Sequence, residues 1–337
     1  MARHHVLAIY PTIFTFNTQT VAQQASRSTP ERVCHAGDCL TIHKAFSFHM
    51  PLKSGHSHRY KALTKHLGSR VHNIRPPAVA GTFYPAQPAT LANDVRAMLA
   101  AARPTVVAGP KALIVPHAGY IYSGATAAAA YASMAKYAAT ITRVILLGPA
   151  HRVAIRGLAL PGANAFATPL GTIELDREAI ASLADLPQVG ISAATHAAEH
   201  SLEVQLPFLQ SILGEFKLLP LAVGNASADE VAEVLDRLWG GDETLIVISS
   251  DLSHFLAYDQ ATAIDRATAE NILSLQPLQD YQQACGAIPI NGLLLAAKRH
   301  HLRPQLIAQC NSGDTAGDRQ RVVGYASFAF FEEPGNG

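Results

Sequence analysis

The sequence predicts an α/β fold, in which a single domain builds a central, mostly parallel or mixed sheet flanked by helices. The first observation behind this prediction is that short apolar runs alternate with helical patterns along the chain. The second is that several of these runs are apolar throughout, which is typical of strands buried on both faces. The third is that neither a repeat nor a composition break divides the chain after residue 75. We therefore expect one domain over residues 75–332 and a short tail at 333–337.

The expected strands are apolar runs that end at turn-forming residues. Residues 112–115 (Ala-Leu-Ile-Val) stop at Pro116, and residues 143–149 end in a Gly-Pro pair. Both runs lack charged residues in their interior, so both should be buried. The remaining expected strands cover residues 157–160, 216–223, 244–250, 306–309 and 322–331.

The expected helices are longer stretches of good helix formers. Residues 123–136 are rich in alanine, and Ser123 is a candidate N-cap. Residues 199–213 follow a helical pattern in which Pro207 is expected to produce a kink. The remaining expected helices cover residues 176–184, 229–238, 259–275, 278–284 and 288–300.

Composition excludes several classes of protein. The 337 residues include 26 Lys+Arg and 25 Asp+Glu, so a net charge of +1 gives no global field for nucleic acid or an anionic membrane. Hydrophobic residues make up 49% of the chain, which excludes a wholly disordered protein. No apolar run approaches the roughly 18 residues of a membrane helix. Four cysteines are too few for a disulfide scaffold and, without a targeting signal, favour a cytoplasmic protein.

Histidine is unusually frequent, with 16 residues, and its distribution is uneven. Nine of them lie in residues 1–73, where nine Lys+Arg face only two Asp+Glu. This segment shows little hydrophobic periodicity, so we expect a basic, disordered N-terminal extension. The remainder of the chain is correspondingly acidic, and its seven histidines are the better candidates for chemistry.

Two alternative interpretations of the extension are less well supported by its sequence. Residues 6–16 could form the apolar part of a signal peptide, but Pro11 interrupts them and no clean cleavage site follows. Cys34, Cys39 and His43 could bind zinc, but their spacing is loose and no second cysteine pair follows. Scattered polar sequence therefore remains the preferred interpretation.

Polar, titratable residues follow three of the expected strands. His117 follows the strand at 112–115, and His151 follows the strand at 143–149. Asp251 and His254 follow the strand at 244–250. Because ligands of open α/β sheets bind beyond the carboxyl ends of strands, we expect these side chains to share one site.

Imidazole and carboxylate groups from separate elements are the donors that transition metals use. Cys285 is a further candidate, because it precedes the helix expected at 288–300 and a helix N-terminus favours the thiolate. The alternative for Cys285 and Cys310 is that each is a small buried residue. His196, His300 and His301 are expected at the surface.

Other familiar chemistries find little support. The chain lacks a Gly-x-x-x-x-Gly-Lys phosphate loop and a Gly-x-Ser-x-Gly nucleophile elbow. Ser249 and Ser250 precede Asp251, which raises the alternative of a serine hydrolase without a recognisable elbow. Glu199 and Glu203 open an expected helix, where they suit the helix dipole or line the rim of a pocket.

Five motifs follow one another along the chain: PHAGY (116–120), LGPAH (147–151), EHSLEVQLP (199–207), SSDLSH (249–254) and CGAIPI (285–290). An opening AGTFYP (80–85) and a late VGYA (323–326) accompany them. Their order resembles that of the Memo family, and the resemblance covers roughly residues 75–332. In prokaryotes, similar proteins are identified as protein B of the AmmeMemoRadiSam system, which implies a functional link to a radical-SAM protein.

The resemblance implies a fold similar to that of class III extradiol dioxygenases, which use non-haem Fe(II). The family's metal ligands fall on His117, His151 and Cys285. His254 matches the acid/base histidine of the dioxygenases, and Asp251 matches an acidic residue linked with metal binding. Residues expected to line the pocket are Glu199, His200 and Tyr120.

Cys285 is a departure from the dioxygenases, whose third iron ligand is a carboxylate. A thiolate is softer and favours Cu(I), Zn or a redox-active iron site, which puts ring cleavage in doubt. The first functional hypothesis is therefore an oxidoreductase that uses iron or copper on a small substrate. The alternative is a non-catalytic protein that binds a metal, a small molecule or a peptide and acts through a partner. Different chemistry in the same pocket, connected to the radical-SAM protein, is a third option.

Overall fold

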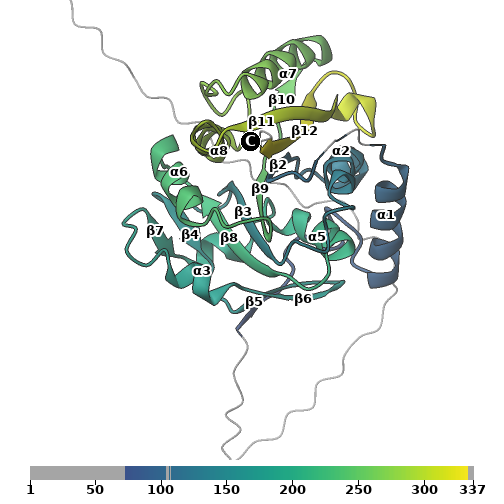
Figure 1. Ribbon diagram of the computed structural model, residues 1–337. Coiled ribbons are helices and arrows are strands. Elements are labelled where there is room, and N and C mark those ends of the chain that lie inside the picture. Colours follow the sequence, from purple (N-terminus) through teal and green to yellow (C-terminus); the bar gives the residue numbers. More distant parts are fainter. Residues whose placement is uncertain (1–72, 104–105, 107, 333–337) are drawn as a thin grey trace, which may run out of the picture. The chain divides into compact units, whose positions relative to one another are not determined.

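The computed structural model describes residues 73–332 apart from 104, 105 and 107 (Figure 1). The extension expected at 1–73, except for Asn73, and the tail at 333–337 lie outside the described residues. A nine-stranded mixed sheet forms the centre of the described part, as the sequence predicted. Its strands are β2 (Ala112–Val115), β3 (Arg143–Pro149), β4 (Leu158–Leu160), β7 (Val189–Ile191), β8 (Lys217–Val223), β9 (Thr244–Ser249), β10 (His254–Leu256), β11 (Leu302–Asn311) and β12 (Val322–Glu332).

The sheet runs in the order β10-β12-β2-β9-β3-β8-β4-β7, and β11 pairs with β12. The four strands β2, β9, β3 and β8 pair in parallel at its centre. Antiparallel pairs join β12 to β2 and β4 to β8, so the sheet is mixed. Because β2, β9 and β3 are parallel neighbours, their carboxyl ends leave the sheet at the same edge.

Helices cover both faces of the sheet, and each face has its own apolar core (Figure 1). Leu113 of β2 points into one core and Ile114 into the other, which is why the strand is apolar throughout. The helices of the first core are α1 (Pro88–Ala101), α2 (Tyr120–Ser133) and α5 (Leu206–Ile212). Those of the second are α3 (Arg177–Ala181), α6 (Ala228–Arg237), α7 (Tyr258–Leu273) and α8 (Ala287–Arg299).

A small second sheet attaches the beginning of the domain to residues 165–174. It consists of β1 (Ile74–Arg75), which pairs in parallel with β5 (Ala165–Thr168), and of β6 (Gly171–Glu174). The buried guanidinium of Arg75 forms an ion pair with the carboxylate of Glu203, in the 3₁₀ helix η1 (Glu203–Gln205). The domain start is therefore fixed to a segment more than a hundred residues away.

Glu203 is fully buried and uses both carboxylate oxygens. Its Oε2 accepts the amide of Ala78 at 2.7 Å, and its Oε1 accepts the amide of Val79 at 3.0 Å. The hydroxyl of Tyr84 also donates to Oε1. With Arg75 as counter-ion, the negative charge is compensated on every side, as a buried charge requires.

The helix expected at 123–136 begins earlier, and Ser123 is not its N-cap. The N-cap of α2 is Gly119, and Ser123 lies within the first turn. The Ser123 hydroxyl donates to the carbonyl of Ala118 at 3.0 Å, so it does not accept an amide. The Asp176 and Ser227 side chains do cap α3 and α6.

The continuous helix expected at 199–213 is wrong. The chain forms a turn, then η1 and then α5, with Pro207 in the first turn of α5. Proline is tolerated there because the amide it lacks has no intrahelical partner, so no kink arises. Glu199 and Glu203 do not serve the helix dipole, since their carboxylates accept amides of other segments and of the turn itself.

The helix expected at 278–284 is also wrong, because these residues form turns and irregular structure. The side chain of Asn291, in α8, takes the place of helical hydrogen bonds there. Its Oδ1 accepts the amide of Leu278 at 2.7 Å, and its Nδ2 donates to the carbonyl of Leu278 at 2.9 Å.

The surface position expected for His196 is wrong, because this residue lies buried in the short helix α4 (Ala193–Ala197). Only 1% of this residue is exposed. Its Nε2 lies 2.7 Å from the carbonyl of Ala159, which can only accept, so Nε2 carries the proton. Burial, followed by the charge of Arg75, lowers the pKa of His196 to about 4 although the Ala159 bond opposes this.

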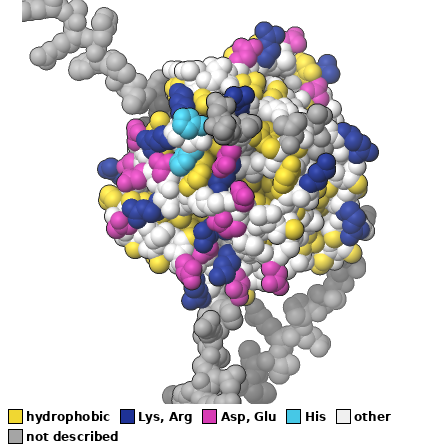
Figure 2. Space-filling model, viewed as in Figure 1, with side chains coloured by type: hydrophobic (Ala, Val, Ile, Leu, Met, Phe, Trp, Pro, Cys, Tyr) yellow, Lys and Arg dark blue, Asp and Glu magenta, His cyan; other side chains and the backbone are white. Residues whose placement is uncertain are grey.

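The surface was expected to lack a nucleic-acid-binding or membrane-spanning feature. On the face shown in Figure 2, Lys and Arg side chains are interspersed with Asp and Glu side chains. They do not gather into one basic patch on that face. Within the part of the chain that the structure describes, no helix has the length and apolar character needed to cross a membrane.

Replacing Glu203 with alanine should lower the free energy of unfolding by about 3–5 kcal/mol, because it leaves Arg75 buried without its counter-ion. Urea denaturation measures this difference. Arg266→Ala is the control, since it removes an exposed pair with Glu270 and should cost less than about 1 kcal/mol. A Glu203→Ala protein as stable as the control would contradict the anchoring role.

Acid should destabilise the protein through His196. The unfolded side chain binds a proton below its ordinary pKa of 6.5, whereas the folded one stays neutral down to about 4. Stability is therefore lost as the pH falls through this window and is retained above it. His196→Gln should flatten the decline in unfolding free energy between pH 7 and pH 5 by about 2 kcal/mol. Equal slopes for both proteins in urea titrations would refute the assignment.

Candidate metal centre

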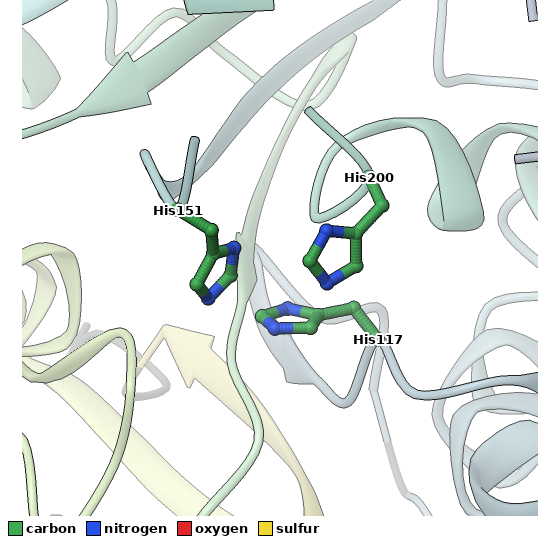
Figure 3. Close-up of side chains that lie close together, drawn as sticks. All are labelled: His117, His151 and His200. Atoms are coloured by element: carbon green, nitrogen blue, oxygen red, sulfur yellow. The ribbon is translucent and has the colours of Figure 1, made fainter. Parts of the chain in front are cut away.

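The sheet brings together the side chains that follow its parallel strands. His117 lies two residues after β2, His151 two residues after β3, and their ring centroids are 5.2 Å apart. His200 joins them from the turn before η1. One ring nitrogen from each of the three histidines lies within 4.8 Å of the others, and Figure 3 shows the rings around a common space. This group could hold a metal ion.

The protonation of His117 is determined by Ser249, the last residue of β9. His117 Nδ1 lies 2.9 Å from Ser249 Oγ. The one hydroxyl hydrogen of Ser249 is donated to the carbonyl of Ser201 at 2.6 Å. Nδ1 must therefore be the donor, and the lone pair of Nε2 is free to bind a metal.

Gln205 completes the polar arrangement behind His117. Its Nε2 donates to Ser249 Oγ at 2.8 Å and to the carbonyl of Pro116 at 2.9 Å. Its Oε1 accepts the hydroxyl of Tyr131 at 2.9 Å. These buried groups are mutually satisfied, so they restrict the orientation of the His117 ring.

Glu199 orients the ring of His151 as Ser249 orients the ring of His117. Burial would raise the pKa of this carboxyl, but the hydrogen bond and charge of His151 and the amide of Ser201 hold it at about 2. The ionised carboxylate can only accept, so His151 Nδ1, 2.9 Å from Oε1, is the donor. Nε2 is therefore the His151 nitrogen that remains available to a metal, as in carboxylate–histidine–metal arrangements.

His200 is the third imidazole of the group. Its ring stacks on His151 with centroids 4.7 Å apart and meets His117 edge-on at 5.3 Å. Burial and then His151 lower its pKa to about 4, so the ring is neutral near pH 7. Its Nδ1 is buried and makes no hydrogen bond within the described residues, although Glu199 Oε1 lies 3.3 Å away.

Cys285 lies beside His117 rather than within the group of three. Its Sγ is 3.3 Å from His117 Nε2. The residue precedes α8 as expected, but the expected tendency towards thiolate is not found. Burial and then the charge of Asp251 raise its pKa to about 12, so the metal-free thiol keeps its proton.

Asp251 and His254 occupy the next positions along the same edge. Asp251 Oδ1 accepts the amide of His117 at 2.7 Å, and burial raises the pKa of this carboxyl to about 7. His254 Nδ1 donates to the carbonyl of Leu252 at 2.8 Å, so Nε2 is the unprotonated nitrogen of the neutral ring. Burial lowers the pKa of His254, which favours the neutral ring.

A pocket of about 460 Å³ lies beside these residues. Tyr120 is not among its lining residues, since its ring packs between Tyr84 and Phe208 and its hydroxyl donates to Val204. Glu199 is likewise buried behind His151. The lining residues are Phe83, Ala118, Gly119, Tyr122, His200, Asp251, His254, Ser312, Gly317, Asp318, Arg321, Val323 and Tyr325.

The serine-hydrolase alternative finds no support in the geometry. Ser249 and Ser250 are fully buried, and each hydroxyl donates to a backbone carbonyl. Ser249 is therefore a group that orients His117. The sequence singled out this serine for a different role, and Gln205 carried no signal of its own.

Comparison with known proteins gives a consistent result. The family model described as Memo-like protein matches residues 75–329. A MEMO1 family protein of Aquifex aeolicus is 37% identical over 76% of this chain and 99% of its own length, and one of Sulfolobus acidocaldarius is 32% identical over the same shares. Among solved structures, an uncharacterised Escherichia coli K12 protein aligns with a TM-score of 0.42 and 13% identity, over 64% of this chain and 98% of that chain. That last similarity is too low to support a conclusion.

Histidine tautomers offer a direct check of the site. In metal-free protein at pH 7, long-range ¹H–¹⁵N spectra should show His117, His151 and His254 protonated at Nδ1. His196 provides the internal contrast, because its bond to Ala159 requires the proton on Nε2. A ring of His117 or His151 that is protonated at Nε2 and not at Nδ1 would contradict the assignment.

Proposed function

The chain belongs to the Memo-like protein family, and we propose that it binds a redox-active iron or copper ion with which it acts on a small substrate as an oxidoreductase. The observation that carries this proposal is the group of His117, His151 and His200, in which His117 is buried, His200 is partly buried and His151 is open to solvent. Two of these rings are held with Nε2 free by Ser249 and Glu199, and the third has a buried nitrogen without a hydrogen bond. Such donors suit iron and copper.

His117 and His151 are proposed as ligands in every arrangement. Cys285 is the proposed third ligand, because the resemblance implies it and its Sγ already lies 3.3 Å from His117 Nε2. A bound ion would displace the thiol proton despite the raised pKa, since coordination favours the thiolate. His200 is the competing donor for that position and otherwise faces the pocket.

An iron or copper ion held here would supply one-electron chemistry and Lewis acidity. The protein's own contribution lies with His254, whose free Nε2 is proposed to accept a proton from a hydroxyl of the substrate. Asp251 holds the backbone of His117 in place. The resemblance of the family to extradiol dioxygenases supports a reaction that consumes O2. The resemblance also supports a functional link to a radical-SAM protein, and the low cysteine content supports a cytoplasmic location.

His117→Ala and His151→Ala should each weaken Fe(II) or Cu binding by about 100-fold or more, as measured by titration against a competing chelator. His301→Ala is the matched control, because this histidine is exposed. Co(II)-loaded protein should show a thiolate charge-transfer band that Cys285→Ser abolishes. A loaded protein without the band, in which His200→Gln loses the metal, would instead assign His200 as the ligand.

Turnover is tested on the same proteins. Metal-loaded wild type, screened with catechols and other small aromatics, should consume O2, and His254→Gln should reduce the rate by about 10²-fold or more while keeping its metal. Loaded protein without O2 uptake would favour the non-catalytic alternative.

A further inference from the structure

The pocket beside the three histidines has a buried end and an exposed end. Asp251 and His200 are largely buried, whereas Asp318 and Arg321 are exposed. Aromatic side chains also line this pocket, among them Phe83. A volume of about 460 Å³ suits a small molecule with an apolar body.

Arg321 differs from most arginines of the described part, because its guanidinium has no carboxylate partner there. Its neighbour Arg319, for comparison, pairs with Asp314 at 3.9 Å. The Arg321 guanidinium carbon instead lies 5.1 Å from the centre of the Phe255 ring. A pocket-lining guanidinium that is positioned but not neutralised is suited to an anionic group of a ligand.

Phe255, which supports Arg321, is unusual in two ways. Its φ angle of 60° lies in the left-handed region, which is costly for a bulky residue. Its side chain is 62% exposed. It occupies an irregularity in the pairing of β10 with β12, directly after His254. Strain and apolar exposure thus coincide at a residue that contacts the pocket-lining Arg321, and this combination points to a functional role.

We propose that this pocket binds a small aromatic carboxylate, which Arg321 recognises through its carboxylate and the aromatic wall through its ring. The proposal rests on the proposed function, in which the same ligand would face His254. Asp318 forms no ion pair with the Arg321 guanidinium within the described residues, and its Oδ1 instead accepts the amides of Gln320 at 2.8 Å and Arg321 at 3.2 Å. Phe255 is a positioning residue that holds the guanidinium.

The test uses the full chain freed of metal with EDTA, so that the probe cannot bind an ion. Benzoate and benzamide are titrated at low ionic strength and followed by ligand-observed NMR. Benzoate should bind about tenfold or more tightly than benzamide, since the two differ mainly in charge. Arg321→Gln should remove this preference, and Phe255→Leu should reduce it. The controls Arg319→Gln and Tyr281→Leu, an exposed cation and an exposed aromatic residue, should leave it unchanged.

Three results would overturn the proposal: equal binding of benzoate and benzamide, a preference that survives Arg321→Gln, or competition by acetate as strong as that of benzoate. The last result would show a simple anion site without recognition of the ring. Because the measurement needs no metal, its failure is separate from a failure of metal binding, and either can occur without the other.

Discussion

The parallel pairing of β2, β9 and β3 is the constraint on which the site depends. Val115 is in register with Ser249, so β2 and β9 end together, and β3 pairs with β9 along the same direction. His117 and His151 therefore come from strands that are not consecutive in space, with β9 between them. The intervening strand contributes the serine that orients His117, and the loop after it contributes Asp251.

The second requirement is that Ser249 and Glu199 form hydrogen bonds with buried polar groups and still leave Nε2 of His117 and of His151 available to a metal. Ser249 has one hydrogen and two lone pairs, and Ser201, Gln205 and His117 use all of them. The carboxylate of Glu199 similarly accepts the ring and backbone N–H groups of His151 and the amide of Ser201. Both arrangements leave Nε2 as the free nitrogen. The two rings are thereby oriented for metal binding through Nε2, and this orientation requires several polar side chains to be buried.

The sequence predicted the central strands and the residues that follow them, because uniformly apolar runs are a local signal of burial on both faces. It failed where tertiary contacts decide the path of the chain. Residues 199–213 have a helical pattern, yet the buried carboxylates of Glu199 and Glu203 hold their first part in turns. His200 lines the pocket as expected, but its place in the group of three histidines was not predicted. Helix α1 was not predicted, because its only buried residues are Leu91 and Val95 and they give a weak helical pattern.

The anchoring of the domain start has a consequence for how the pocket is assembled. Phe83 lines the pocket and contacts His200, with ring centroids 4.8 Å apart. Its carbonyl accepts the amide of Tyr120, and the nearby amides of Ala78 and Val79 bond to Glu203. One wall is thus made first during synthesis but can be seated only after residue 203 has emerged. Seating this wall therefore requires the closure of a loop of more than a hundred residues, which is a costly long-range contact.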